Sequence, residues 1–197
     1  MPNWASRRSI LKSPKRQASP ACTSVIEVIA EPHLTAADEA RIAEILRQSF
    51  PTDYQGRSFF QQRPHMRLVW REGRVLSHMS LFLRAIRVGD RVVDVVGVGD
   101  VATAAEARGR GHATALLDRC KTVASSSCAR FVILFGDRAL YDRAGFLPAA
   151  NPFRHCQMVG ARTGDIVEGA SPFLRVLPLT DAPWPEDEQV DFLGHLF

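Results

Sequence analysis

The sequence has no long hydrophobic run. No stretch approaches the ~18 consecutive apolar residues that a membrane-spanning helix needs, so a soluble protein is expected. The N-terminal stretch also lacks the apolar core of a secretory signal, its longest such run being Ile10-Leu11. The sequence therefore predicts a protein with neither a membrane span nor a secretory leader.

Cysteine is scarce and shows no metal-binding pattern. The four cysteines form no C-x-x-C pair, and no histidine lies at metal-ligand spacing from them: they are Cys22, Cys120, Cys128 and Cys156. No metal site is expected. Buried, reduced thiols in a cytoplasmic protein are the predicted state.

Acidic residues are missing from one end of the chain. Residues 1–24 hold five of the 25 basic residues and no acid, which leaves 20 basic and 21 acidic residues in the remainder. The formal charge of +4 therefore belongs to a tail, and a nucleic-acid partner is not expected. We predict a disordered basic tail over 1–24 and a single domain over 25–197. A transit peptide or a phosphate-binding arm is the alternative for the tail.

The first half of the predicted domain contains a strand, a helix and an antiparallel meander. VIEVIA (25–30) alternates as a strand, and Thr35 is a plausible N-cap for a helix that ends before Pro51. A second, weaker helical stretch is predicted around Phe59. Three extended runs within 66–103, separated by turn residues, predict the meander.

The second half is expected to alternate between helices and strands. A helix over 111–124 carries an apolar stripe that includes Cys120, and FVILF (131–135) is a strand buried on both faces. A short helix follows. FRHCQMVG (153–160) and FLRVLPL (173–179) are the expected closing strands.

The segment 101–117 indicates an anion site. It runs from an apolar strand through a loop with two arginines and two glycines into an amphipathic helix. Helix N-termini present unpaired N–H groups and a partial positive charge, and glycines let a ligand approach the backbone. A cofactor that carries a pyrophosphate is the expected occupant.

Two other phosphate-binding motifs compete with this interpretation. A P-loop is excluded because no lysine lies between Lys15 and Lys121. Residues 97–102 satisfy G-x-G-x-x-A, the dinucleotide fingerprint, which would need a helix to open at Gly99 and further parallel strand-helix units. Too few such units follow, so this motif is disfavoured.

Two short motifs resemble signatures of one family. Arg108-Gly109-Arg110-Gly111-His112-Ala113 resembles the [RQ]-x-x-G-x-[GA] acyl-CoA signature of the GNAT N-acetyltransferase superfamily. FGDRALYDRAGF (135–146) is similar to the second signature, in which a tyrosine precedes a Gly-Phe pair by four residues. The resemblance covers roughly 25–150. It implies an α+β, three-layer α/β fold with a GNAT-like mixed, mostly antiparallel central sheet and flanking helices.

The resemblance also implies the activity and the cofactor residues. The chain is expected to be an acyltransferase that moves an acetyl group from acetyl-CoA to a primary amine, without a metal. Backbone groups along the pantetheine arm and around the pyrophosphate are assigned to Val101, Ala102, Thr103, Arg108, Gly109, Arg110, Gly111, His112, Ala113 and Thr114. The side chain of His112 contacts phosphate or is solvated at the helix start, and the second alternative is favoured. His78 is expected to be a satisfied strand residue.

Direct transfer to an amine needs an acid and a base. Tyr141 lies at the signature position and is the expected acid, the alternative being that its ring only packs beside Phe146. Asp100 is the preferred base, ahead of Asp94. A regular strand would put both aspartates on one face, which a bulge would change, and ion pairs with arginines such as Arg84 or a water relay are the alternatives.

The acceptor is less constrained by the sequence. Residues 165–191 hold seven acids and one base, which would attract a cationic amine such as an aminoglycoside or a polyamine, or form only a solvated face. Residues 76–89 look similar to nodulation acyltransferases and aminoglycoside 2'-N-acetyltransferases. Trp184 anchors the end of the chain or lines the acceptor cleft. A non-catalytic acyl-CoA-binding or interaction module, a longer acyl chain, a protein amine and a homodimer remain open alternatives.

Overall fold

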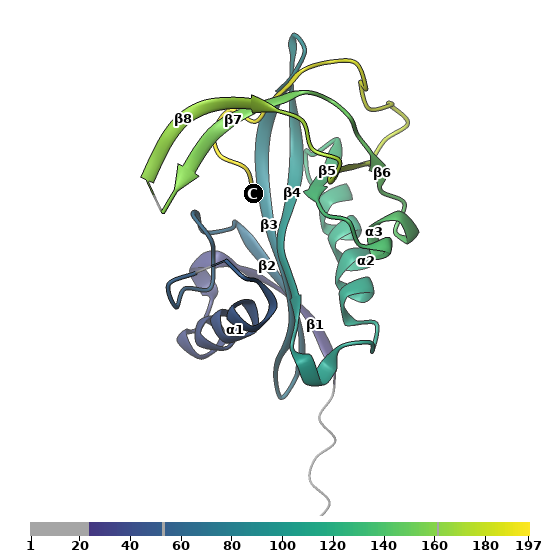
Figure 1. Cartoon of the computed structure of the whole chain (residues 1–197). Helices are drawn as coiled ribbons and strands as arrows, with labels where there is room; N and C mark the ends of the chain where they lie inside the picture. The colour runs from purple at the N-terminus through teal and green to yellow at the C-terminus, as the bar shows by residue number, and fades with distance from the viewer. Residues whose placement is uncertain (1–23, 53, 161) are drawn as a thin grey trace, which may run out of the picture.

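The computed structural model describes residues 24–52, 54–160 and 162–197 (Figure 1). The predicted basic tail, 1–24, lies outside the described residues except for its last residue. The helices of the described chain are η1 (Glu31–His33), α1 (Ala36–Ser49), η2 (Ala105–Ala107), α2 (His112–Ser125) and α3 (Ala139–Arg143). The strands are β1 (Val25–Ala30), β2 (Met66–Glu72), β3 (Arg74–Val88), β4 (Arg91–Thr103), β5 (Phe131–Phe135), β6 (Leu147–Pro148), β7 (Phe153–Val159), β8 (Arg162–Gly169), β9 (Leu174–Pro178) and β10 (Val190–Asp191).

The strands of the described chain form one mixed sheet. Its main path runs β6-β9-β5-β4-β3-β10-β7-β8, and β2 and then β1 extend it from β3. The pairs β4–β5 and β10–β7 are parallel, and the remaining pairs are antiparallel. The predicted mixed, mostly antiparallel sheet and its β2–β3–β4 meander are confirmed.

Helices cover both faces of this sheet. Figure 1 shows α1 on one face and α2 with α3 on the other. Leu116, Leu117 and Cys120 of α2 are buried against residues of β2 to β5. Ile42 and Ile45 of α1 are buried in a second cluster. The two clusters give the predicted three-layer arrangement, and the stripe that includes Cys120 faces the core as expected.

Local signals explain where the two long helices begin. The backbone N–H of Asp38 donates to the Thr35 hydroxyl at 3.1 Å, so Thr35 is the N-cap of α1, as predicted. Gly111 is the N-cap of α2 and has a φ of 81°, a left-handed conformation that glycine adopts without strain. No helix in the described residues is long and apolar enough to cross a membrane.

The helical stretch expected around Phe59 does not form. The described residues between α1 and β2 are turns and bends instead. Gln55 and Gln61 have φ values of 53° and 43°, left-handed conformations that interrupt a right-handed helix. The guanidinium groups of Arg57 and Arg63 lie 5.1 and 4.6 Å from the centroid of the Phe59 ring. Ser58 also donates to Glu39 and its carbonyl accepts from Arg67, so contacts with other segments accompany the non-helical conformation of this loop.

A bulge in β4 opens the sheet. The register with β3 pairs Ser80 with Gly99 but His78 with Ala102, so β4 carries one extra residue there, and Asp100 has a φ of 51°. Pairing with β5 stops at Val98. Beyond that point β4 and β5 separate. No helix opens at Gly99, so the dinucleotide fingerprint is excluded.

The closing strands were predicted only in part. β7 and β9 form within the two expected segments, but β6, β8 and β10 were not predicted. β6 and β10 have two residues each, and most residues of β8 are exposed, so neither length nor alternating hydrophobicity marks them.

Candidate active site

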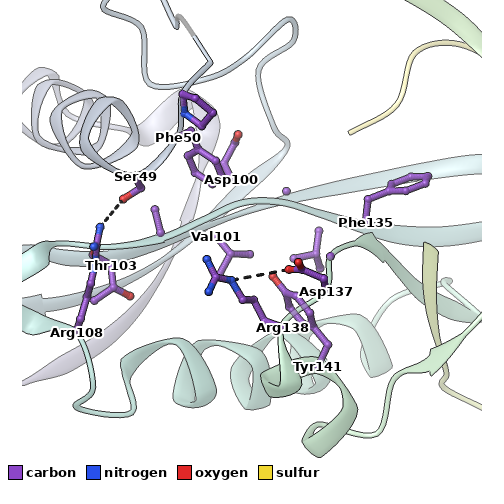
Figure 2. Close-up of a pocket in the computed structure, with 15 residues that line it drawn as sticks. Ser49, Phe50, Asp100, Val101, Thr103, Arg108, Phe135, Asp137, Arg138 and Tyr141 are labelled. Carbon is purple, nitrogen blue, oxygen red and sulfur yellow. Dashed lines mark hydrogen bonds and ion pairs between the residues drawn. The ribbon is translucent and has the colours of Figure 1, made fainter. Parts of the chain in front are cut away.

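A cavity of about 620 Å³ lies where β4 and β5 separate (Figure 2). Its walls come from β4 and the residues after β5, from the end of α1 and from α3. Of the residues predicted for the cofactor and for catalysis, Val101, Ala102, Thr103, Arg108, Tyr141 and Asp100 line it. The structure therefore brings the two predicted catalytic side chains to one cavity.

The β4 wall offers backbone rather than side chains. Residues 99–103 have no β5 partner among the described residues, because the β4–β5 register ends at Val98. An unpaired strand edge can bond an extended, amide-containing chain. The Arg108 side chain folds back onto this edge, and its Nε donates to the Thr103 carbonyl at 3.1 Å.

The first turn of α2 has backbone N–H groups without helical hydrogen bonds. The N–H of Ala115 makes the first helical bond, to the Gly111 carbonyl at 3.1 Å, which leaves the N–H groups of the preceding turn outside the helix ladder. Gly109 and Gly111 have φ values of 74° and 81°, and an added Cβ would meet nothing within 4 Å at either. Arg110 is paired with Glu72 at 2.9 Å. This end can receive a phosphate through backbone donors.

The favoured solvated position for His112 is wrong. Its side chain is only 2% exposed and stacks on Trp70, with ring centroids 4.5 Å apart and planes at 12°. Burial lowers the pKa of the imidazole. The ring fixes the start of α2 to β2 and does not line the 620 Å³ cavity, so only its backbone suits the predicted role in holding the cofactor.

Tyr141 packs beside Phe146 and also reaches the cavity, so its position is compatible with both alternatives. Its ring packs edge-on to Phe146 with centroids 6.1 Å apart, and the side chain also lines the cavity. A Cβ at residue 136 would lie 2.4 Å from this ring, so Gly136 is needed to seat it. Burial raises the pKa of the phenol, which keeps it protonated. Among the described residues, nothing hydrogen-bonds the Tyr141 hydroxyl.

Asp100 lies at the bulge, on the same side of the sheet as α1. The Tyr54 hydroxyl donates to its Oδ1 and the Ser80 hydroxyl donates to its Oδ2, both at 3.0 Å. Burial raises the pKa of this carboxyl, and the two hydrogen bonds oppose that shift. Asp94 is exposed and does not line this cavity. In the described chain it forms no ion pair with an arginine such as Arg84. Sequence reasoning missed Tyr54, which follows α1 in the loop wrongly predicted as helical.

A buried polar network holds the bulge in place. Arg67 and His78 are both fully buried. An arginine only donates, so Arg67, 3.1 Å from His78 Nε2, makes that nitrogen the acceptor, and Nδ1–H donates to the Asp100 carbonyl at 3.1 Å. Burial, and then the charge of Arg67, lower the pKa of His78 to about 3. Arg67 is in turn paired with Glu31 at 2.6 Å.

Two features expected near the acceptor lie elsewhere. Trp184 is buried, and its Nε1 donates to Asn151 Oδ1 at 2.7 Å, so it anchors the chain and does not line the cavity with Tyr141. The acidic residues of 165–191 do not line that cavity either. Within the described residues, no group of three or more side chains could hold a metal ion.

Comparisons with known proteins agree with this geometry. The family described as Acetyltransferase (GNAT) domain matches residues 32–149. The GNAT family N-acetyltransferase YhbS from Escherichia coli, solved in complex with CoA, is 23% identical with a TM-score of 0.62, over 90% of this chain and 93% of that chain. No curated protein matches the sequence.

Two more distant structures share the fold. A GNAT family acetyltransferase from Brucella melitensis, in complex with acetyl-CoA, is 18% identical with a TM-score of 0.56, over 84% of this chain and 94% of that chain. NAA60 from Arabidopsis thaliana, in complex with a bisubstrate analogue, is 18% identical with a TM-score of 0.55, over 79% of this chain and 98% of that chain. The family match spans more than half of the sequence and contains both signature motifs. The chain is an acyltransferase that belongs to the GNAT acetyltransferase family.

Proposed function

We propose that the protein transfers an acetyl group from acetyl-CoA directly to the primary amine of a small acceptor. The observation that carries this proposal is the cavity between β4 and β5, which is lined by an unpaired strand edge, by Asp100 from the α1 side and by Tyr141 from the α3 side (Figure 2). A donor arm, a proton donor and a proton acceptor are the three requirements of the reaction.

The donor half of the proposal rests on backbone groups. The edge of residues 99–103 suits the amides of the pantetheine arm, and the N–H groups from Gly109 to Thr114 suit the pyrophosphate. The cavity is large enough, at about 620 Å³, for the arm and an acetyl group. Similar structures contain CoA or acetyl-CoA, which supports acetyl-CoA as the donor here.

The protons can be followed through the two side chains. Asp100 accepts one proton from the acceptor ammonium, which frees the nitrogen lone pair to bond the thioester carbon. N–H groups of 101–103 polarise the carbonyl. As the C–S bond breaks, Tyr141 gives its phenolic proton to the sulfur. The second proton on nitrogen restores the phenol, and Asp100 releases its proton to water, so that an amide, free CoA thiol and one proton result.

The cysteines support direct transfer over an acyl-cysteine route. Burial raises the pKa of Cys120 to about 12, so its thiolate is scarce near neutral pH. Cys128 and Cys156 are also free thiols, and none of the three lines the cavity. A cytoplasmic location, a homodimer and a single domain over 25–197 stay predictions.

The proposal is tested by calorimetry and by release of free CoA thiol. We expect saturable acetyl-CoA binding and thiol release with at least one member of a primary-amine panel. Tyr141→Phe should lower kcat by about 10²-fold or more while the acetyl-CoA Kd stays within about twofold, because only the transferable proton is lost. Binding without turnover over the whole panel would favour the non-catalytic module, and no binding would refute the proposal.

A further inference from the structure

A second cavity, of about 200 Å³, shares Asp100 with the first. Its walls come from the loop after α1, from β3 and from residues 195–197. Because Asp100 lines both cavities, a nitrogen at this carboxylate lies at their junction. The second cavity is thus placed to hold the body of the acceptor while the first holds the donor.

The second cavity has both aromatic and polar walls: four of its nine lining residues are aromatic, and Gln61, Gln62, Asp100 and His195 are polar. Tyr54, Phe60, Phe82 and Phe197 contribute rings. Phe82 stacks with Phe197 at a centroid distance of 6.2 Å, and Tyr54 meets Phe60 edge-on at 5.8 Å. The four rings favour a flat, apolar group in the ligand, and the polar side chains favour an amine on it.

The Phe197 wall is held by specific contacts. Arg84 donates to the carbonyls of His195 and Phe192 at 2.5 and 2.7 Å. A Cβ at residue 97 would lie 2.6 Å from the Phe197 ring, so Gly97 provides the space in which that ring lies. The cavity therefore has a defined shape on this side.

The charge of the second cavity suits one cation. Asp100 is the single acidic side chain among its described lining residues. Burial, and then the charge of Arg84, lower the pKa of His195, which keeps this imidazole neutral near neutral pH. Arg84 pairs with no carboxylate in the described chain and lines the adjoining cavity. The positive charge of Arg84 beside the second cavity disfavours a second ammonium on the acceptor.

The acidic residues that suggested a polycationic acceptor are not part of this cavity. None of the seven acids in 165–191 lines it. Asp191, the last of them, accepts the Leu193 N–H at 2.8 Å and pairs with Arg154 at 3.5 Å. The cavity therefore offers no acidic side chain besides Asp100 to bind the further ammonium groups of an aminoglycoside or a polyamine.

The size sets a further limit. A volume of about 200 Å³ corresponds to roughly seven water molecules of liquid, which is room for one ring and a short chain. We propose that the acceptor is a small arylalkylamine, with one primary ammonium at Asp100 and one aromatic ring between Phe60, Phe82 and Phe197. This inference rests on the proposed function and names its substrate class.

An amine panel with matched members tests the inference. Phenethylamine, butylamine, spermidine and kanamycin are compared by thiol release at fixed acetyl-CoA. We expect kcat/KM for phenethylamine to exceed that of each other amine by at least tenfold, because the ring and the single charge both match the cavity. Equal or better turnover of spermidine or kanamycin would overturn the inference.

A variant tests whether the ring binds in the second cavity. Phe60 is 39% exposed, so Phe60→Ala is expected to fold, and Phe173→Ala, at 49% exposure and outside both cavities, is the matched control. Phe60→Ala should raise KM for phenethylamine about five- to tenfold, with KM for butylamine and the acetyl-CoA Kd unchanged. A uniform change for all amines, or the same change in Phe173→Ala, would refute the placement.

Different results would refute the proposed acceptor class and the proposed transferase activity. Turnover of polycations but not of phenethylamine would remove only the arylalkylamine inference and leave the transferase. Absence of acetyl-CoA binding, or of thiol release with every amine, would remove the proposed function and the inference with it.

Discussion

The backbone groups proposed to bind the donor lie in one continuous stretch of chain, residues 98–114, whereas the proposed acceptor side is assembled from side chains of distant segments. The donor side consists of the bulged end of β4, the loop after it and the start of α2. The acceptor side takes residues from the loop after α1, from β3 and from 195–197. Backbone donors depend on local conformation, but an aromatic pocket depends on tertiary packing. The proposed donor contacts of the backbone are therefore local in sequence, and the proposed acceptor contacts are not.

The largest expected effect comes from the residue that both sides share. Asp100→Asn keeps the shape of the side chain but removes the proton acceptor. We expect kcat to fall by about 10²- to 10⁴-fold, with the acetyl-CoA Kd within about twofold, as measured by thiol release and calorimetry. Wild-type turnover in this variant would show that water relays serve as the base and that the two sides meet elsewhere.

A smaller effect is expected from the network under the bulge, on which both sides depend. The folded state holds His78 neutral, with a pKa of about 3 against an ordinary value of 6.5. As pH falls below 6.5, the unfolded chain binds a proton that the folded chain does not, so stability is lost until about pH 3. From neutral pH to about pH 5 the loss through His78 is about 2 kcal/mol.

Urea unfolding of the wild type and of His78→Gln at the two pH values measures this loss. His112, His155 and His195 also have lowered pKa values and weaken both proteins in acid. The difference between the two pH dependences therefore isolates His78. Equal slopes would contradict the neutral, Nδ1-protonated His78 that the contacts with Arg67 and Asp100 imply.

The smallest effect should be confined to the donor side. Gly111→Ala meets no steric obstacle, but alanine at a φ of 81° is strained by about 1 kcal/mol. Distortion of the amides at the start of α2 should weaken acetyl-CoA binding by about fivefold in calorimetry. Relative kcat/KM values across the amine panel should not change. A changed ranking of the amines by kcat/KM would contradict the separation between the donor side and the acceptor side.

This contrast explains how much the sequence could predict. The 108–113 signature, the helix after it and the Tyr141 motif depend on spacing within short segments, and each lies where it was expected. Thr35 and the turns of the meander depend on equally local chemistry. The mixed sheet followed from the resemblance that these motifs carry.

The predictions that were wrong, and the residue that was missed, depend on contacts between distant segments. The ring of His112, at the start of α2, is buried where it stacks on Trp70 of β2. The loop around Phe59 was expected to be helical, but Gln55 and Gln61 adopt left-handed conformations and the loop makes contacts with distant residues such as Glu39 and Arg67. Tyr54 reaches Asp100 across 46 residues of sequence. No local pattern contains this information.

The way in which residues 192–197 are held has a consequence for how selectivity can change. Arg84 donates hydrogen bonds to two backbone carbonyls of this segment, and the N–H of Cys156 donates to the Gly194 carbonyl at 2.7 Å. Those bonds do not depend on which side chains the segment carries. Substitutions at 195–197 can thus reshape the second cavity while these backbone hydrogen bonds persist. A library randomised at these three positions would explore new acceptors with the acetyl-CoA half left intact, and natural divergence could follow the same route.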